Sequence, residues 1–258
     1  MIKNLIALVV SIIVIHLIYT GYIRPEANAM IEIALAKGES SPRSIVVILK
    51  DYEQEICFIL MCWGVYLIAS SYRQILRTQY LFSVDFINII QEKNKENQAT
   101  PSDKLDVEGI ISELDNQIPE DCQTSPLIQT LRSSLWRYAA TSNVQNLSDA
   151  IESNLEALAI RQDSENTMIR YLIWAIPSIG FIGTVRGIGQ ALSQADQALA
   201  GDIAGMTDSL GVAFNSTFVA LLISIFLMFL FHQLQRLQDT QILNTQAYCE
   251  KYLINRIR

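Results

Sequence analysis

The chain has 258 residues, half of which are hydrophobic, and its mean hydropathy is positive. Such a composition is unusual for a soluble globular protein and indicates segments that are surrounded by lipid. The formal net charge of −7 argues against a nucleic-acid partner, and the sequence has no phosphate-binding loop, catalytic triad or spacing of metal ligands, so we expect neither an enzyme nor a bound cofactor or metal.

Four apolar segments are long enough to cross a bilayer as helices, which takes roughly 20 residues. They cover residues 2–23, 56–72, 171–192 and 212–231. The first segment has an alternative interpretation as a signal peptide, because Lys3 precedes its apolar run. No clear small-x-small cleavage site follows it, so we expect a membrane helix that stays in the protein.

Lysine and arginine flank these segments unevenly, and cationic loops tend to remain in the cytoplasm. Six such residues then fall on one side of the membrane: Lys3, Arg73, Arg77, Arg161, Arg170 and Arg236. Residues 193–209 contain three aspartates and no lysine or arginine, which suits the opposite side. We therefore expect both termini in the cytoplasm.

The region between the second and third spans is predicted to be helical. Four apolar residues recur at intervals of four, four and three: Leu147, Ile151, Leu155 and Leu158. No helix breaker lies between Val144 and Ile176, so we expect the third membrane helix to begin near Val144 and to run unbroken for about 70 Å. Residues 94–104 and 118–126 are predicted turns, and residues 44–49 alternate as a strand does.

These segments predict an all-α membrane protein with four transmembrane helices, of which the long third and fourth extend into a helical cytoplasmic domain. The predicted order is transmembrane helix 1–23, periplasmic loop 24–55, transmembrane helix 56–72, cytoplasmic helical region 73–170, transmembrane helix 171–192, periplasmic loop 193–211, transmembrane helix 212–231 and cytoplasmic C-terminal helix 232–258.

The third and fourth spans each carry a threonine at the same predicted depth. Thr184 lies 14 residues after Arg170, and Thr217 lies 14 residues before Phe231. At 1.5 Å per residue, both hydroxyls lie roughly 21 Å from the cytoplasmic boundary, so we expect a single polar layer in the outer half of the membrane. A threonine in a membrane helix commonly bonds its own backbone, and plain helix packing is the competing interpretation.

Small residues near these threonines predict a close approach of the two helices. The fourth span carries a stripe of them: Ala213, Ser216, Ala220 and Ser224. On the third span, Gly180 lies one turn before Thr184, and Gly183 and Gly187 form a small-xxx-small pair. Pro177 is expected to weaken this helix locally and to set a kink.

Two ionisable side chains, Arg186 and His16, lie within the predicted spans. Arg186 is about 200° around the helix from Thr184, so we expect it to point away from the threonines, towards the outer interface or a neighbouring subunit, with a structural role. His16 stands alone in its span, and we interpret it as a packing or snorkelling residue, with a proton relay as the alternative.

The predicted spans contain no aspartate or glutamate. Moving ions by discrete binding generally needs an intramembrane group that gains and loses charge, and threonine does not titrate near neutral pH. Any carboxylate on an ion path is therefore expected to come from another chain.

Residues 177–188, PSIGFIGTVRGI, resemble the signature of the MotA/TolQ/ExbB family, in which a proline, a Gly-x-x-Gly-Thr-Val and a further glycine open the helix that lines the channel. These positions are held by Pro177, Gly180, Gly183, Thr184, Val185 and Gly187. Residues 208–225 are similar to the family's next helix, where Thr217 precedes a small and apolar run. Arg186 departs from the pattern, since an aromatic or apolar residue is common there, as does Val212, where ExbB-like members carry a glutamate.

The resemblance implies a stator-type, multi-pass subunit of an ion-driven motor in the bacterial inner membrane. Five copies of the chain would surround a dimer of a single-span partner, whose intramembrane aspartate binds and releases the ion while work passes to a load. The implied ion is H⁺, with Na⁺ as the alternative, and Thr184 and Thr217 are assigned to its path. The competing hypothesis is a non-conducting helical membrane scaffold.

Overall fold

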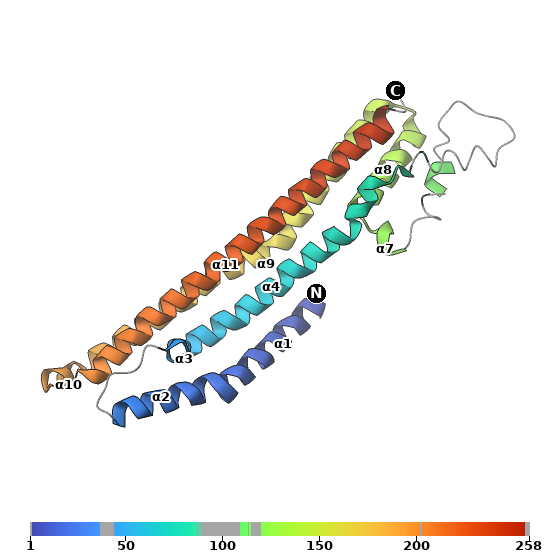
Figure 1. Ribbon diagram of the computed structural model, residues 1–258. Helices are drawn as coiled ribbons and strands as arrows, with labels where there is room; N and C mark the ends of the chain where they lie inside the picture. The colour runs from blue at the N-terminus through green and yellow to red at the C-terminus, as the bar shows by residue number, and fades with distance from the viewer. Residues whose placement is uncertain are drawn as a thin grey trace. The chain divides into compact units, whose positions relative to one another are not determined.

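The computed structural model describes residues 2–36, 44–86, 88, 109–112, 114, 120–201 and 203–255. Every regular element assigned within these residues is helical. Four helical segments there are long and apolar enough to cross a membrane: Ile2–Ala34, Tyr52–Ser83, Val144–Ser193 and Ala204–Ile254. The predicted all-helical fold with four apolar helices is therefore confirmed (Figure 1).

The chain divides into two compact units. Unit 1 comprises Met1–Ser70 and Thr167–Gln233, and unit 2 comprises Ser71–Asn166 and Leu234–Arg258. Helices α4 (Tyr52–Thr78), α9 (Val144–Ser193) and α11 (Ala204–Cys249) each contribute residues to both units.

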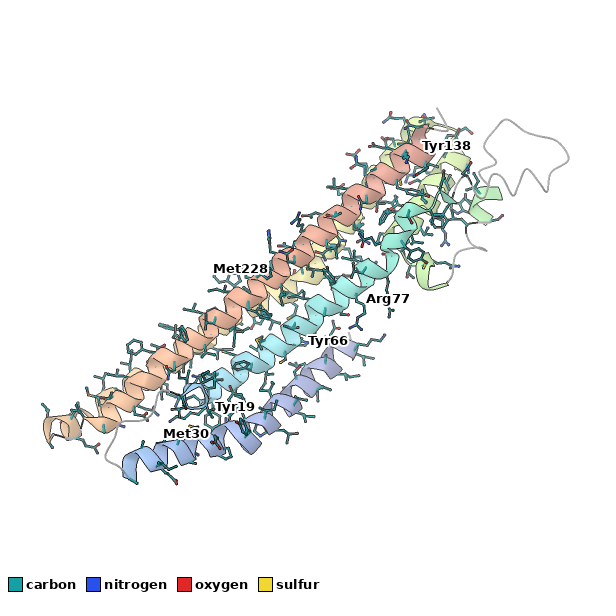
Figure 2. The ribbon with its side chains drawn as sticks, in the orientation of Figure 1. Tyr19, Met30, Tyr66, Arg77, Tyr138 and Met228 are labelled. Carbon is teal, nitrogen blue, oxygen red and sulfur yellow. The ribbon has the colours of Figure 1, made fainter. Side chains whose placement is uncertain are left out.

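Unit 1 begins with a helix that continues beyond the predicted first span. Helix α1 (Ile2–Ile18) passes through a π-helical turn, η1 (Tyr19–Ile23), into α2 (Arg24–Ala36), so the first part of the predicted 24–55 loop is helical. Tyr19 is 1% exposed and lies with its ring 6.4 Å from that of Phe58 on α4 (Figure 2). The indole nitrogen of Trp63 on α4 donates to the carbonyl of Asn4, 3.1 Å away, so α1 packs along α4.

Residues 44–49 alternate in sequence as a strand does, but the structure forms no strand there. These residues form a one-turn helix, α3 (Ile45–Ile48), whose N-cap is Ser44. The Ser44 hydroxyl accepts a hydrogen bond from the backbone N–H of Val47 at 3.3 Å, and such a cap favours a helix start over an extended strand. Helix α4 then begins at Tyr52, about one turn before the predicted second span.

Helix α9 begins at Val144 and runs for 50 residues, as predicted. Pro177 lies inside it, and the helix continues on both sides of the proline. After the short α10 (Ala195–Leu199), helix α11 begins at Ala204, so its first two turns occupy the end of the predicted 193–211 loop. Figure 1 shows α9 and α11 side by side.

Unit 2 has its own hydrophobic core, built from α8 (Pro126–Thr141), α9 and the end of α11 with η3 (Glu250–Ile254). Leu147, Ile151 and Leu155 of the predicted helical face are buried in it. The turn predicted at 118–126 is described from residue 120, where α7 (Glu120–Gln123) and a turn precede α8; the one predicted at 94–104 lies outside the described residues.

Buried amides also join the two long helices within unit 2. The side-chain amide of Asn166 donates to the Oε1 atom of Gln238 at 2.7 Å, and that of Gln162 donates to Gln241 at 3.0 Å. All four side chains are at most 9% exposed, so each bond satisfies groups that water does not reach.

Candidate functional site

In unit 1, α9 and α11 are in close contact along the predicted small residues. A Cβ atom placed on Gly180 would lie 2.5 Å from the Cβ of Ala220, and one placed on Gly187 would lie 2.8 Å from the Cβ of Ala213. Real Cβ atoms do not approach so closely, so the two helices reach this separation only because these positions are glycine. Gly187 would also meet the carbonyl of Ser209 at 2.8 Å, which places that serine inside the helix contact.

Pro177 and Ser224 are linked across the two helices. A proline has no N–H, so Pro177 cannot donate to the carbonyl four residues earlier, that of Ile173. The hydroxyl of Ser224 on α11 donates to this carbonyl at 2.9 Å, and the serine is 6% exposed. The second helix therefore supplies the hydrogen bond that the proline removes from the first.

The structure brings Thr184 and Thr217 together. Their hydroxyls form a hydrogen bond with each other, from α9 to α11. The Thr184 Oγ1 atom also lies 3.0 Å from the carbonyl oxygen of Ala213, and the Thr217 Oγ1 atom lies 3.2 Å from that of Gly180. Both threonines are half-buried. We call these four oxygen atoms the threonine layer.

The threonine layer has more hydrogen-bond acceptor sites than donor protons. A hydroxyl carries one proton and two acceptor lone pairs, and a carbonyl oxygen only accepts. Thr184 and Thr217 thus supply two protons among four oxygen atoms. Oxygen atoms grouped in this way are suited to a hydronium or a small hard cation.

Arg186 has a partner that the sequence reasoning missed. Its Nε and Nη2 atoms donate to the two carboxylate oxygens of Glu53 at 2.7 and 2.8 Å, and its Nη2 lies 3.7 Å from Asp51. The Glu53 side chain is 10% exposed and that of Arg186 36%. The expectation that Arg186 points to the outer interface or another subunit is corrected: it binds α4 of its own chain, because α4 begins early enough to include Glu53.

A second ion cluster surrounds Glu55 on the same helix. The Nδ1 atom of His16 lies 2.7 Å from one carboxylate oxygen of Glu55, and Arg24 binds the other. The Arg24 guanidinium also lies 4.2 Å from the ring centre of Tyr52. His16 is therefore not isolated, which corrects its interpretation as a lone packing residue.

Helix α4, which is long enough to cross a membrane, therefore contains glutamates. The predicted second span began later, at residue 56, and contained none. Glu53 and Glu55 are both buried and both held by cations. Asp51 lies just before this helix, and burial raises the pKa of its carboxyl. Arg186 was the available signal in the sequence, because a charged residue in a span needs a partner. The acidic residues that directly precede the apolar segment 56–72 were the candidates.

Among the described residues, no group of three or more His, Cys, Asp or Glu side chains could hold a metal ion. The threonine layer groups four oxygen atoms between α9 and α11 in this unit.

Residues 123–247 match the model of the MotA/TolQ/ExbB proton channel family. The match covers just under half of the chain and includes both threonines and the small residues around them. Searches of curated proteins and of solved structures found no match. The resemblance carried by residues 177–188 and 208–225 is confirmed by this match to the family over residues 123–247.

Proposed function

We propose that the chain is the channel-forming subunit of a membrane motor driven by an ion gradient. Five copies surround a dimer of a single-span partner, in the inner membrane of a bacterium and with both termini in the cytoplasm. The transported ion is H⁺, with Na⁺ as the alternative, and work passes through the partner to a load. The family supports a proton-channel subunit of a multi-pass membrane complex, and the finer points are proposals.

The observation that carries the proposal is the threonine layer. The hydroxyls of Thr184 and Thr217 meet between two membrane-length helices and share two main-chain carbonyls. An isolated threonine needs only its own backbone as acceptor. Two threonines that bond across helices, at a surface that stays half-exposed, offer an ion a set of oxygen ligands.

The charge-changing group is assigned to the partner. Threonine hydroxyls orient or coordinate an ion but do not titrate near neutral pH. Of the nearby carboxylates of this chain, Glu53 and Glu55 already face arginine or histidine side chains, and Asp51 lies 3.7 Å from Arg186. An aspartate in the partner's span, placed against the threonine layer, would complete the path.

The long helices α9 and α11 are assigned to the inner wall of the pentamer, and α1 and α4 to the lipid side. Large apolar side chains of α9 and α11 are exposed on the single chain, among them Phe181 (64%), Phe214 (69%) and Phe218 (58%). Neighbouring copies would cover such side chains. A mass measurement on the purified complex tests the number of copies, and a dimer would contradict the assignment.

The test replaces each threonine by valine, which keeps the shape and deletes the hydroxyl. Thr184→Val and Thr217→Val are each expected to lower ion-driven activity steeply while the complex still assembles. The matched control is Thr207→Val, since Thr207 is exposed on α11 and its hydroxyl bonds only its own helix, at the carbonyl of Ile203. Activity is read as proton flux into vesicles that contain the complex purified with its partner and that hold a pH-sensitive dye.

A non-conducting scaffold is the alternative function. In that case the small residues only pack helices, the unmutated complex carries no proton flux, and both valine variants keep normal activity in cells with assembly intact. That outcome would refute the channel assignment of the threonine layer.

A further inference from the structure

The Arg186–Glu53 pair lies within one helical turn of the threonine layer. Arg186 follows Thr184 by two residues, which is about 3 Å along the helix axis. A Cβ atom placed on Gly183 would lie 3.2 Å from the Cγ of Glu53 and 2.6 Å from the Oγ of Ser216, the residue before Thr217. The Glu53 side chain thus reaches the crossing of α9 and α11.

An arginine at this place acts against a cation path unless it is neutralised. Its guanidinium stays charged at any physiological pH. Over about 10 Å and at an effective dielectric constant of about 20, an unpaired positive charge lowers the occupancy of a nearby cation site roughly 15-fold. Both carboxylate oxygens of Glu53 face the guanidinium, so this pair carries no net charge, and a second carboxyl, that of Asp51, lies farther away at 3.7 Å from the Nη2 atom.

We infer that Glu53 sets the electrostatics of the ion path: as the counterion of Arg186, it keeps the surroundings of Thr184 and Thr217 free of net positive charge. This inference rests on the proposed function. A pair that only held α4 against α9 would make the same contacts. The test therefore has to distinguish an effect of the pair's charge on ion flux from an effect of the pair on helix packing.

The test compares the two halves of the pair in proton flux, with the full chain and its partner in dye-containing vesicles. Glu53→Gln removes the nearer of the two carboxylates beside Arg186, which makes the surroundings more positive by one charge, and should lower the flux about tenfold. Arg186→Gln leaves a net negative charge and should keep or raise the flux. The double variant Glu53→Gln with Arg186→Gln is neutral again and should return the flux to within about twofold of the unmutated complex.

Equal losses in the two single variants would overturn the inference, because a purely structural pair is broken equally from either side. Unchanged flux in an assembled Glu53→Gln complex would overturn it as well. If Glu53→Gln fails to assemble, Arg186→Gln and the double variant still decide the matter. A steep loss of flux in either one, with assembly intact, contradicts the assigned role of charge.

The threonine variants separate this inference from the proposed function. If Thr184→Val and Thr217→Val lose flux while Glu53→Gln keeps it, Glu53 has no electrostatic role in the ion path and the channel assignment stands. If the unmutated complex carries no proton flux, or both threonine variants keep it, the proposed function is refuted and the inference falls with it.

Discussion

The hydrogen bond from Ser224 to the carbonyl of Ile173 allows a quantitative test of how α11 supports α9. Ser224→Ala removes the donor and leaves the Ile173 carbonyl without the bond that Pro177 already denies it within the helix. Ser224 is 6% exposed, so water does not readily replace the hydroxyl. A buried carbonyl that loses its partner costs about 1–3 kcal/mol, and we expect the free energy of unfolding to fall by that amount.

The same substitution should be milder when residue 177 is an alanine. Pro177→Ala restores an N–H four residues after Ile173, so the helix itself can satisfy the carbonyl. In that background, Ser224→Ala should cost less than about 1 kcal/mol, and the cycle of single and double variants should give a coupling energy of about 1–2 kcal/mol. Additive effects of the two substitutions would refute the link between the proline and the serine.

The assay is reversible unfolding of the purified chain in mixed micelles, followed by circular dichroism at increasing denaturing detergent. Ser178→Ala is the matched control, because Ser178 is exposed and its hydroxyl bonds the carbonyl of Trp174 in its own helix. It should change the free energy of unfolding by less than about 0.5 kcal/mol.

Three further predictions use the same unfolding assay. Gly180→Ala should destabilise the chain by about 1–3 kcal/mol, since its Cβ would lie 2.5 Å from another Cβ; Gly189→Ala meets nothing within 4 Å and should be neutral or stabilising by up to about 1 kcal/mol, since alanine favours a helix over glycine, and equal losses would contradict the close helix contact. Asn166→Leu should cost about 1–3 kcal/mol by leaving the amide of Gln238 unpaired, and adding Gln238→Leu should recover most of this; no recovery would show that the amide pair is not the cause. Burial raises the pKa of the Asp51 carboxyl, so ionising it in the folded protein lowers stability as the pH rises above the ordinary value of 3.8. Asp51→Asn should therefore keep or raise the free energy of unfolding at neutral pH and leave it unchanged well below pH 3.8. A lower free energy of unfolding at neutral pH would contradict this reasoning.

Features that depend on local periodicity and on counting along a helix could be predicted from the sequence. Apolar runs indicated the four long helices, and the absence of breakers placed the start of α9 at Val144. Equal spacing from the two membrane boundaries predicted that Thr184 and Thr217 lie at the same depth in one polar layer, and their hydroxyls form a hydrogen bond with each other. Their role in an ion path stays a prediction.

Ion pairs between distant segments were missed for a physical reason. Hydropathy marks where a helix becomes apolar, not where it begins, and the polar first turn of α4 was assigned to a loop. Glu53 lies in that turn, so its pairing with Arg186, 133 residues away, has no local signature. Pro177 and Ser224 were both noticed, one as a kink and one as a packing residue, but only the register of the two helices shows that one compensates the other.

Two of the four oxygen atoms in the threonine layer belong to the main chain, at Gly180 and Ala213. No substitution deletes a main-chain carbonyl, so mutations can change these ligands only by altering the distance between the helices. Glycine and alanine set that distance, although neither carries a functional group. Under the proposed function, a screen for inactive variants would therefore return these small residues as readily as the threonines, because bulkier replacements would displace the oxygen atoms without touching a reactive side chain.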